Sequence, residues 1–168
     1  MKKSWLSSAL LFLLVGCMMP LEQQRQEPRV EVVFQNSEKF TDIKDSVLPT
    51  EKAEQETLIQ LKEFIIDQAI SYIDDKHKLT IVFTDIDLAG DFEPWRGPEW
   101  SNVRIVKSIY PPRFCFTWQV MDLAGKVVKK GSEDIRDLAF DMRVTLDRND
   151  PLHIEKDVLK DWMSLNLK

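Results

Sequence analysis

The chain has 168 residues, of which 43% are hydrophobic and 30% are charged, the proportions of one ordinary globular domain. These proportions exclude a disordered chain and a collagen-like repeat, and two cysteines exclude a disulfide-rich framework and a Cys-rich zinc module. The formal net charge of -5 gives the protein no general electrostatic reason to hold DNA or RNA. We therefore expect no nucleic-acid partner.

Residues 1–16 have the pattern of a secretory signal peptide, with lysines at positions 2 and 3 and then an apolar run that closes on Gly16. The run is too short to cross ~30 Å of hydrocarbon comfortably. Its last residues and Cys17 resemble the bacterial lipobox, which implies cleavage after Gly16 and acylation of Cys17. The alternative is a hydrophobic N-terminal helix that ends at a cysteine by chance. The lipobox residues are Leu14, Val15, Gly16 and Cys17.

Acylation of Cys17 predicts that the protein is anchored to a membrane, because two or more acyl chains give stable attachment. Residue 18 is a methionine, and no aspartate follows the cysteine. In enteric-type bacteria this pattern favours the periplasmic face of the outer membrane. Residues 17–29 are polar and Gln-rich and are predicted to form a flexible tether, and residues 30–168 a single domain.

The domain is predicted to be α+β, a two-layer sandwich with two helices on one face of a five-stranded antiparallel or mixed sheet. The expected order is β-α-β-β-β-β-α, with hairpins joining the last four strands. Phe116 and Trp118 should lie in the core, against the helix that presents Leu61 and Ile65. The predicted elements are a strand at 30–34, a helix capped by Thr50 that ends near 74–75, strands at 79–87, 103–107, 114–120 and 126 to about 130, and a helix capped by Asp150.

An acidic run follows the clearest strand and is the strongest local cluster of chemical groups. Asp85 and Asp87 are two residues apart, which places them on one face with Cα atoms ~6.5–7 Å apart. Side chains two residues apart in a strand share a face, so Asp85 and Asp87 should lie on the same face as Phe83. We therefore expect these acids to continue the core-facing side of the strand beyond its last apolar residue. The favoured interpretation is structural: these acids accept hydrogen bonds from loop amides and pair with Arg104 or Arg113.

Two chemical alternatives for this run stay open. A loose divalent-cation site could use Asp85, Asp87 and Asp91, although an EF-hand is rejected because Ala89 and Arg96 stand at its fifth and twelfth positions. A paired-carboxylate hydrolase is the other alternative. No nucleophile, phosphate-loop or metal-ligand motif accompanies the acids, so we expect no cofactor and favour a protein that is not an enzyme.

The Gly/Pro/Trp-rich loop at 88–101 contains Trp95 and Trp100. Exposed tryptophans can stack on sugar rings or anchor a partner protein. A loop tryptophan more often folds back as a lid on its own core, and we favour that interpretation. Cys115 should be a single thiol in a strand, acting as a small hydrophobic residue rather than a nucleophile.

Several sequence pieces together resemble a family of small exported proteins of Gram-negative bacteria, known as the domain of unknown function three-zero-one-six. The similarity covers nearly the whole mature chain, from about Val30 to Trp162. It implies an exported single domain and brings no activity. The pieces that carry it are Val32-Val33-Phe34, Lys39-Phe40-Thr41-Asp42, Thr84-Asp85-Ile86-Asp87-Leu88-Ala89-Gly90, Glu93-Pro94, Arg104-Ile105, Ile109-Tyr110-Pro111-Pro112-Arg113, Gly125, Leu152, Glu155-Lys156 and Trp162.

Three functions follow as hypotheses. The favoured one is a non-enzymatic, lipid-anchored module of the cell envelope that binds or assists a partner, which is an envelope protein or a glycan. The second is a periplasmic hydrolase or divalent-metal-dependent enzyme that uses Asp85, Asp87 and Asp91. The third is a glycan or small-ligand binder that uses Trp95 and Trp100.

Overall fold

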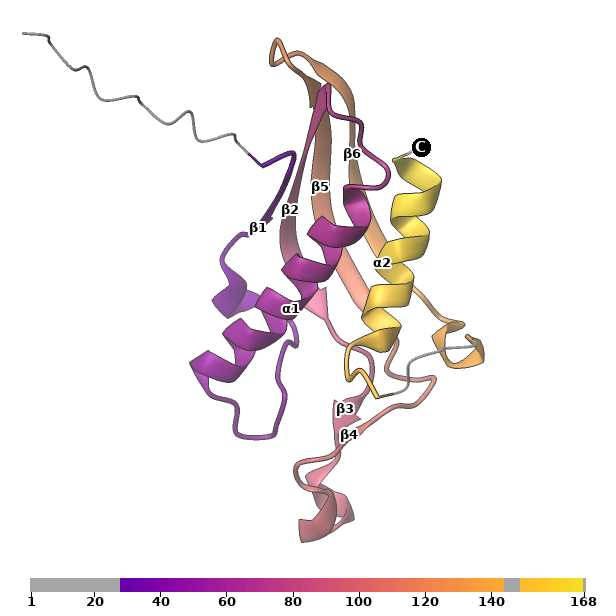
Figure 1. Ribbon diagram of the computed structural model, residues 1–168. Coiled ribbons are helices and arrows are strands. Elements are labelled where there is room, and N and C mark those ends of the chain that lie inside the picture. Colours follow the sequence, from indigo (N-terminus) through magenta and orange to yellow (C-terminus); the bar gives the residue numbers. More distant parts are fainter. Residues whose placement is uncertain (1–27, 144–148, 168) are drawn as a thin grey trace, which may run out of the picture.

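Two helices cover one face of a four-stranded mixed sheet, and a second, two-stranded sheet extends from one end of it (Figure 1). The computed structural model describes residues 28–143 and 149–167. The expected α+β class is therefore confirmed. The elements in chain order are β1 (Val30–Phe34), α1 (Glu51–Ala69), β2 (His77–Asp87), β3 (Asp91–Phe92), β4 (Arg104–Ile105), β5 (Arg113–Asp122), β6 (Val127–Arg136) and α2 (His153–Asn166).

The main sheet has the order β1-β2-β5-β6, so the prediction of five strands is wrong. β1 is parallel to β2, and the other neighbours are antiparallel. The segment predicted as a strand at 103–107 forms only the two-residue β4, which pairs with β3 outside this sheet. The physical reason is that β5 pairs with β2 from end to end, from His77 opposite Asp122 to Asp87 opposite Arg113. No strand can lie between them.

The core lies between the helices and the sheet. Phe116 and Trp118 are buried, as predicted, and both rings contact Trp162 of α2 edge to face, with centroids 4.7 and 5.7 Å away. From α1, Leu61 and Ile65 are also buried. Apolar side chains from both layers therefore form one core.

The helix starts follow local capping chemistry. The Thr50 hydroxyl oxygen accepts the Ala53 N–H at 3.2 Å, as predicted for the first residue before α1. The helix ends at Ala69, earlier than predicted. Asp150 accepts the Leu152 N–H at 2.9 Å in a turn, and α2 begins only at His153.

A β-bulge in β2 changes which residues face the core. Phe83 pairs with Phe116, but the next pair is Asp85 with Cys115, so Thr84 is an extra residue. One extra residue reverses the alternation of side chains along the strand. Ile86 therefore takes the core position and is fully buried, and Asp85 and Asp87 turn to the sheet face that the helices leave open. The prediction that these two acids continue the core face is wrong for this reason.

Candidate functional site

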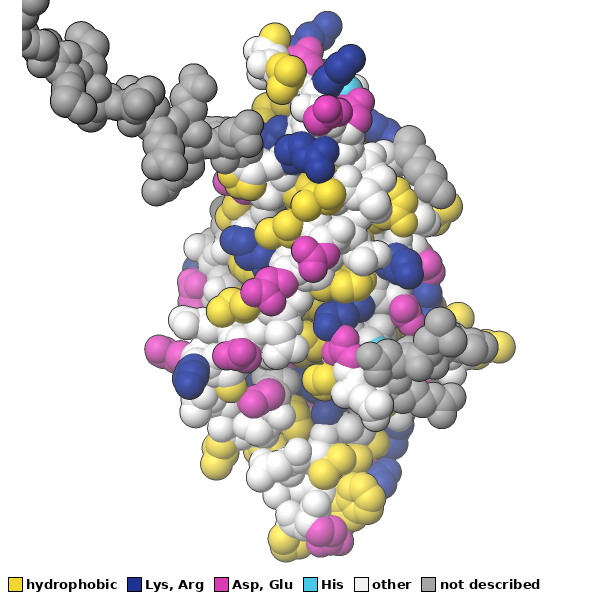
Figure 2. All heavy atoms as spheres, viewed as in Figure 1, with side chains coloured by type: hydrophobic (Ala, Val, Ile, Leu, Met, Phe, Trp, Pro, Cys, Tyr) yellow, Lys and Arg dark blue, Asp and Glu magenta, His cyan; other side chains and the backbone are white. Residues whose placement is uncertain are grey.

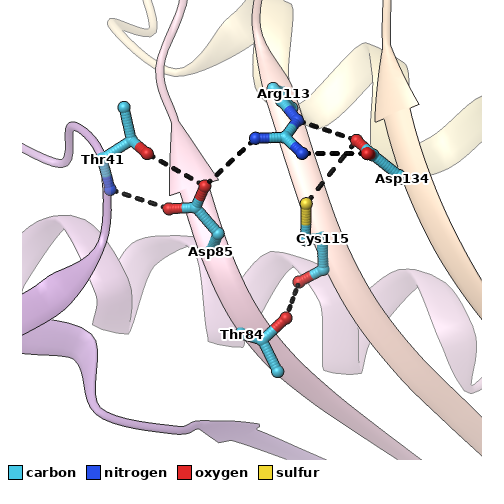
Figure 3. A network of polar contacts seen from close by, with 6 residues as sticks. All are labelled: Thr41, Thr84, Asp85, Arg113, Cys115 and Asp134. Carbon is cyan, nitrogen blue, oxygen red and sulfur yellow. Dashed lines mark hydrogen bonds and ion pairs between the residues drawn. The ribbon is translucent and has the colours of Figure 1, made fainter.

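On the open face of the sheet, Asp85 belongs to a network of polar contacts (Figure 3). Its carboxylate accepts the Thr41 N–H at 2.7 Å and the Thr41 hydroxyl at 2.9 Å. Arg113 approaches the same carboxylate at 3.5 Å. These are the loop-amide and arginine contacts expected of Asp85, and they occupy both of its oxygens.

The same network continues across the sheet to β6. Arg113 pairs with both oxygens of Asp134, at 2.8 and 2.9 Å. The hydrogen bond from Arg113 lowers the pKa of Asp134 to about 2. The Cys115 thiol lies 3.5 Å from Asp134, and burial raises the thiol pKa. A raised pKa disfavours the thiolate, so this cysteine has the chemistry of a structural residue rather than a nucleophile.

Arg104 does not reach Asp85 or Asp87. Its guanidinium pairs with Asp42 at 3.0 Å and donates to the carbonyl oxygens of Gly90 at 2.9 Å and Lys44 at 2.6 Å. Sequence reasoning assigned it the wrong acid, because Asp42 follows β1 and was not recognised as a neighbour of β2. Arg104 therefore ties the start of β4 to the two loops beside it.

Asp87 lies at a separate hollow of about 370 Å³, which it lines together with Asp42 and Asp91. Burial, followed by the nearby charges of Asp42 and Asp85, raises the pKa of Asp87. Asp91 points its carboxylate back to the Phe92 N–H at 2.7 Å. The structure thus brings Asp87 and Asp91 to one hollow and leaves Asp85 in the arginine network. Within residues 28–143 and 149–167, no group of three or more His, Cys, Asp or Glu side chains is arranged to hold a metal ion.

Between β2 and β5 the chain leaves the main sheet and forms a projection, seen at the lower end of the molecule in Figure 1. Its base is held by Glu93, which is only 2% exposed. The Glu93 carboxylate accepts hydrogen bonds from Arg96, from Lys107 at 2.5 Å and from the Tyr110 hydroxyl at 3.1 Å. The bond from Lys107 is the main reason that the pKa of Glu93 is lowered. Sequence analysis gave Glu93 no role, because Arg96 lies in the turn that follows it and Lys107 and Tyr110 belong to a second turn further along the chain.

The end of this projection, residues 94–103, is here called the tryptophan loop. Trp95 is 72% exposed and Trp100 is 41% exposed, so the favoured prediction that these tryptophans fold back as a lid on the core is wrong for both. Two successive Pro-led turns, Pro94–Arg96 and Pro98–Trp100, leave too few residues for either ring to return to the main core. Hydrophobic side chains are visible at this lower tip in Figure 2.

A second carboxylate that sequence reasoning missed is Glu155, on the first turn of α2 and 2% exposed. It accepts the Ala89 N–H at 2.7 Å, which ties α2 to the loop that follows β2. Burial raises its pKa. Glu155 and Arg104 both line a cavity of about 530 Å³ between the first turns of α1 and the start of α2. In the sequence, Glu155 stood out only as one of the positions that carry the family resemblance.

The tryptophan loop and the start of the domain lie at opposite ends of the sheet. Val30 pairs with Leu79 near the beginning of β2, and the loop leaves from the other end of that strand, after Asp87. An 11-residue strand spans about 33 Å at ~3.3 Å per residue. Figure 1 shows the same separation, with the chain entering at one end and the projection at the other.

The fold and site define a two-layer α+β domain with a projecting loop whose base is held by the hydrogen bonds of Glu93. The family model described as "Protein of unknown function (DUF3016)" matches residues 28–165, and the chain belongs to this family. Comparison with curated proteins and with solved structures gives no match. Cys17 and the predicted signal peptide at 1–16 lie outside the described residues. Among the described residues, none of the helices has both the length and the apolar character needed to span a membrane.

Proposed function

We propose that this protein is a lipid-anchored binding module on the periplasmic face of the outer membrane, and that the tryptophan loop holds a protein partner. The observation that carries the proposal is the 72% exposure of Trp95 on a loop whose base is fixed by Glu93. Exposing a large aromatic ring to water has a free-energy cost that burial in an interface removes. A loop that is already ordered also loses less entropy on binding.

A protein partner fits the composition of the loop better than a glycan. Trp95 is followed directly by Arg96, and tryptophan and arginine are the residue types most enriched at the energetic centres of protein interfaces. Trp100 is also exposed on the same loop, and Val103 is 42% exposed beside it. This gives a small apolar surface with two charged residues, Arg96 and Glu99, at its rim, the usual anatomy of an interface.

Catalysis through Asp85, Asp87 and Asp91 has less support. Asp85 is already engaged on both carboxylate oxygens by Thr41 and Arg113, which hold it in a structural network rather than presenting it to a ligand. Asp87 and Asp91 share a hollow, but Asp91 is engaged by the Phe92 N–H. The binding proposal does not depend on these acids.

The membrane anchor rests on the lipobox at Cys17. With the anchor before β1, the tryptophan loop lies at the far end of the sheet, about 26 Å further along β2 from the Leu79 position that pairs with Val30. This arrangement favours presentation of the loop to the periplasm rather than to the anchoring membrane. It therefore favours a soluble domain or the periplasmic part of an envelope protein as the partner.

The test is site-specific photo-cross-linking in cells, with a photoreactive amino acid in place of Trp95. We expect a discrete cross-linked protein band that is lost when Trp100→Ala is added. The matched control carries the same amino acid in place of Leu123, which is 82% exposed on the β5–β6 hairpin at the other end of the sheet. Cross-links of equal pattern from positions 95 and 123 would contradict the proposal. A product that digestion of peptidoglycan or polysaccharide removes would point to the glycan hypothesis.

A further inference from the structure

The outer edge of β6 is an unsatisfied strand edge. β6 is the last strand of the main sheet, and no other strand among the described residues pairs with its far side. It is ten residues long and contains no proline, and its pairing with β5 is regular from Lys129 to Arg136, after a bulge at Val128. That stretch presents a regular row of backbone N–H and C=O groups. Such an edge is a template for adding one more strand.

The charges along β6 are arranged in two halves of opposite sign. Lys129 and Lys130 precede Gly131, and Glu133 and Asp134 follow it. In an antiparallel pair of two identical strands, the basic half of each copy lies opposite the acidic half of the other. The strand is therefore complementary to itself in the antiparallel direction and repels itself in the parallel one.

The register of β6 against β5 says which of its side chains share a face. Ser132 is opposite Thr117 and Asp134 is opposite Cys115, so both lie on the open face of the sheet, and Lys130 lies there with them. Gly131 is opposite the buried Trp118 and lies on the helix face. In a continuous two-fold sheet the open faces of both copies must coincide, so only registers that pair residues of the same face are allowed.

One allowed register joins opposite charges without opposing like charges. When Ser132 lies opposite Ser132 of the second copy, Lys130 lies opposite Asp134 twice, by symmetry. Sliding the second copy by two residues in one direction places Lys130 opposite Arg136. This first alternative brings like charges together, which is unfavourable for directly opposed residues. Sliding it in the other direction puts Gly131 opposite Gly131 of the second copy and pairs Lys129 with Glu133 on the helix face, and it loses both Lys130–Asp134 pairs. In that register the two Ser132 residues are no longer opposite each other, so a cross-link between them distinguishes it from the Ser132 register.

From the open edge, its antisymmetric charges and the Lys130–Asp134 pairs of the Ser132 register, we propose that β6 pairs antiparallel with β6 of a second copy of this chain about a two-fold axis at Ser132. The pairing makes one continuous eight-stranded sheet. All four helices then cover the same face, because the two-fold axis is perpendicular to the sheet. The tryptophan loops are not needed for this contact, so the proposal is independent of the proposed function.

The test is disulfide cross-linking of the full chain in cells, in a Cys115→Ser background. In either kind of antiparallel pair the two Ser132 Cα atoms are about 4.5–5.5 Å apart, which lies within the range that a disulfide can bridge. We expect Ser132→Cys to give a covalent dimer on a non-reducing gel. Thr117→Cys is the matched control, because Thr117 is opposite Ser132 on the same face but one strand in from the edge.

A charge reversal gives the second measurement. Lys130→Glu changes two attractive pairs into repulsive ones, so it should weaken dimer formation about tenfold in sedimentation equilibrium. Lys126→Glu makes the same change of charge outside the paired segment and should leave the dimer intact. A monomer at all concentrations, with no Ser132→Cys dimer, would overturn the proposal. Equal cross-linking by Thr117→Cys would also overturn it, because that outcome indicates face-to-face packing of sheets.

Discussion

Arg113 and Asp134 form a two-point ion pair across β5 and β6, with nitrogen–oxygen distances of 2.8 and 2.9 Å. The pairing lowers the pKa of Asp134 from an ordinary value of 3.8 to about 2. Because the folded state holds this carboxylate ionised, the unfolded state binds more protons in that interval. The stabilisation is complete above about pH 4 and is lost as the pH falls toward about 2.

We therefore predict that Asp134→Asn flattens the dependence of Tm on pH between about pH 4 and pH 2, and lowers Tm at neutral pH. Thermal melts of both proteins across this interval measure the difference. Asp141→Asn, which removes a carboxylate from the same part of the chain, is the control. Parallel curves for wild type and Asp134→Asn would show that the ion pair contributes nothing to folding.

The protonation of Glu155 affects stability in the opposite direction to that of Asp134. Burial raises its pKa above the ordinary value of 4.5, and within the described residues no lysine or arginine contacts its carboxylate. Between the ordinary and the raised pKa the folded state binds the extra proton, so stability falls as the pH rises through that interval. Glu155→Gln keeps an oxygen to accept the Ala89 N–H and removes the buried charge.

We expect Glu155→Gln to raise Tm at neutral pH and to make Tm less dependent on pH above about 4.5. Differential scanning calorimetry at several pH values tests this. A lower Tm for Glu155→Gln at every pH would mean that the ionised carboxylate is compensated in the folded protein. Glu56→Gln, on the rim of the same cavity, serves as the comparison.

Gly131 allows Trp118 to lie flat against β6. A Cβ atom at Gly131 would be 2.6 Å from the Trp118 Nε1 atom, and that ring is fixed by a 2.9 Å hydrogen bond to Glu133. Gly131→Ala should therefore lower the free energy of unfolding by about 1–3 kcal/mol through overpacking. Urea denaturation measures this change in the free energy of unfolding, and Ser132→Ala, at the neighbouring exposed residue, is the control. A loss equal to that of the control would mean that the indole ring shifts freely.

Glu93 fixes the base of the tryptophan loop, so Glu93→Gln should loosen that loop selectively. The amide cannot accept charge-assisted hydrogen bonds from Arg96 and Lys107 as the carboxylate does. We expect faster hydrogen exchange in residues 94–103 and unchanged exchange in β5, measured by mass spectrometry. Faster exchange throughout the sheet would show instead that Glu93 supports the whole domain.

The lipobox predicts that Cys17 is acylated. Labelled palmitate should enter the wild-type protein and not Cys17→Ser, and the variant should fractionate as soluble protein or stay unprocessed. Cys115→Ser removes the other cysteine and should be labelled as strongly as the wild type. Equal labelling of wild type and Cys17→Ser would refute the anchor.

The sequence predicted the helices, the long strands and the burial of Phe116 and Trp118, because those features follow from hydrophobic periodicity within one element. It could not predict the bulge at Thr84, because an extra residue in a strand leaves the local composition unchanged. That single residue moved Asp85 and Asp87 from the core face to the open face. The prediction that residues 103–107 form a strand of the main sheet was wrong for a different reason. The β-propensity of a segment does not indicate which strand it will pair with.

The candidate site was predicted in part. Of the two arginines predicted as partners of Asp85, Arg113 is in contact with it. The contact forms although the prediction placed the strand at 103–107 between their two strands, which are in fact direct neighbours. Glu155 was missed because its partner, the Ala89 N–H, lies 66 residues away along the chain. Glu93 was missed because two of its three partners, Lys107 and Tyr110, lie 14 and 17 residues further on and reach it only through the fold of the loop. The exposure of Trp95 was also missed, since average burial of tryptophan gives no information about a loop held away from the core.

The placement of the chain entry and the tryptophan loop at opposite ends of β2 has a mechanical consequence. With Cys17 anchored and the loop bound to a partner, tension enters through the start of β1 and leaves through the end of β2. Because these strands are parallel neighbours, the pull is directed along them and loads their hydrogen bonds together in shear. Peeling would instead break the bonds one at a time. If both attachments form, this geometry resists extension between them more strongly than a peeling geometry does.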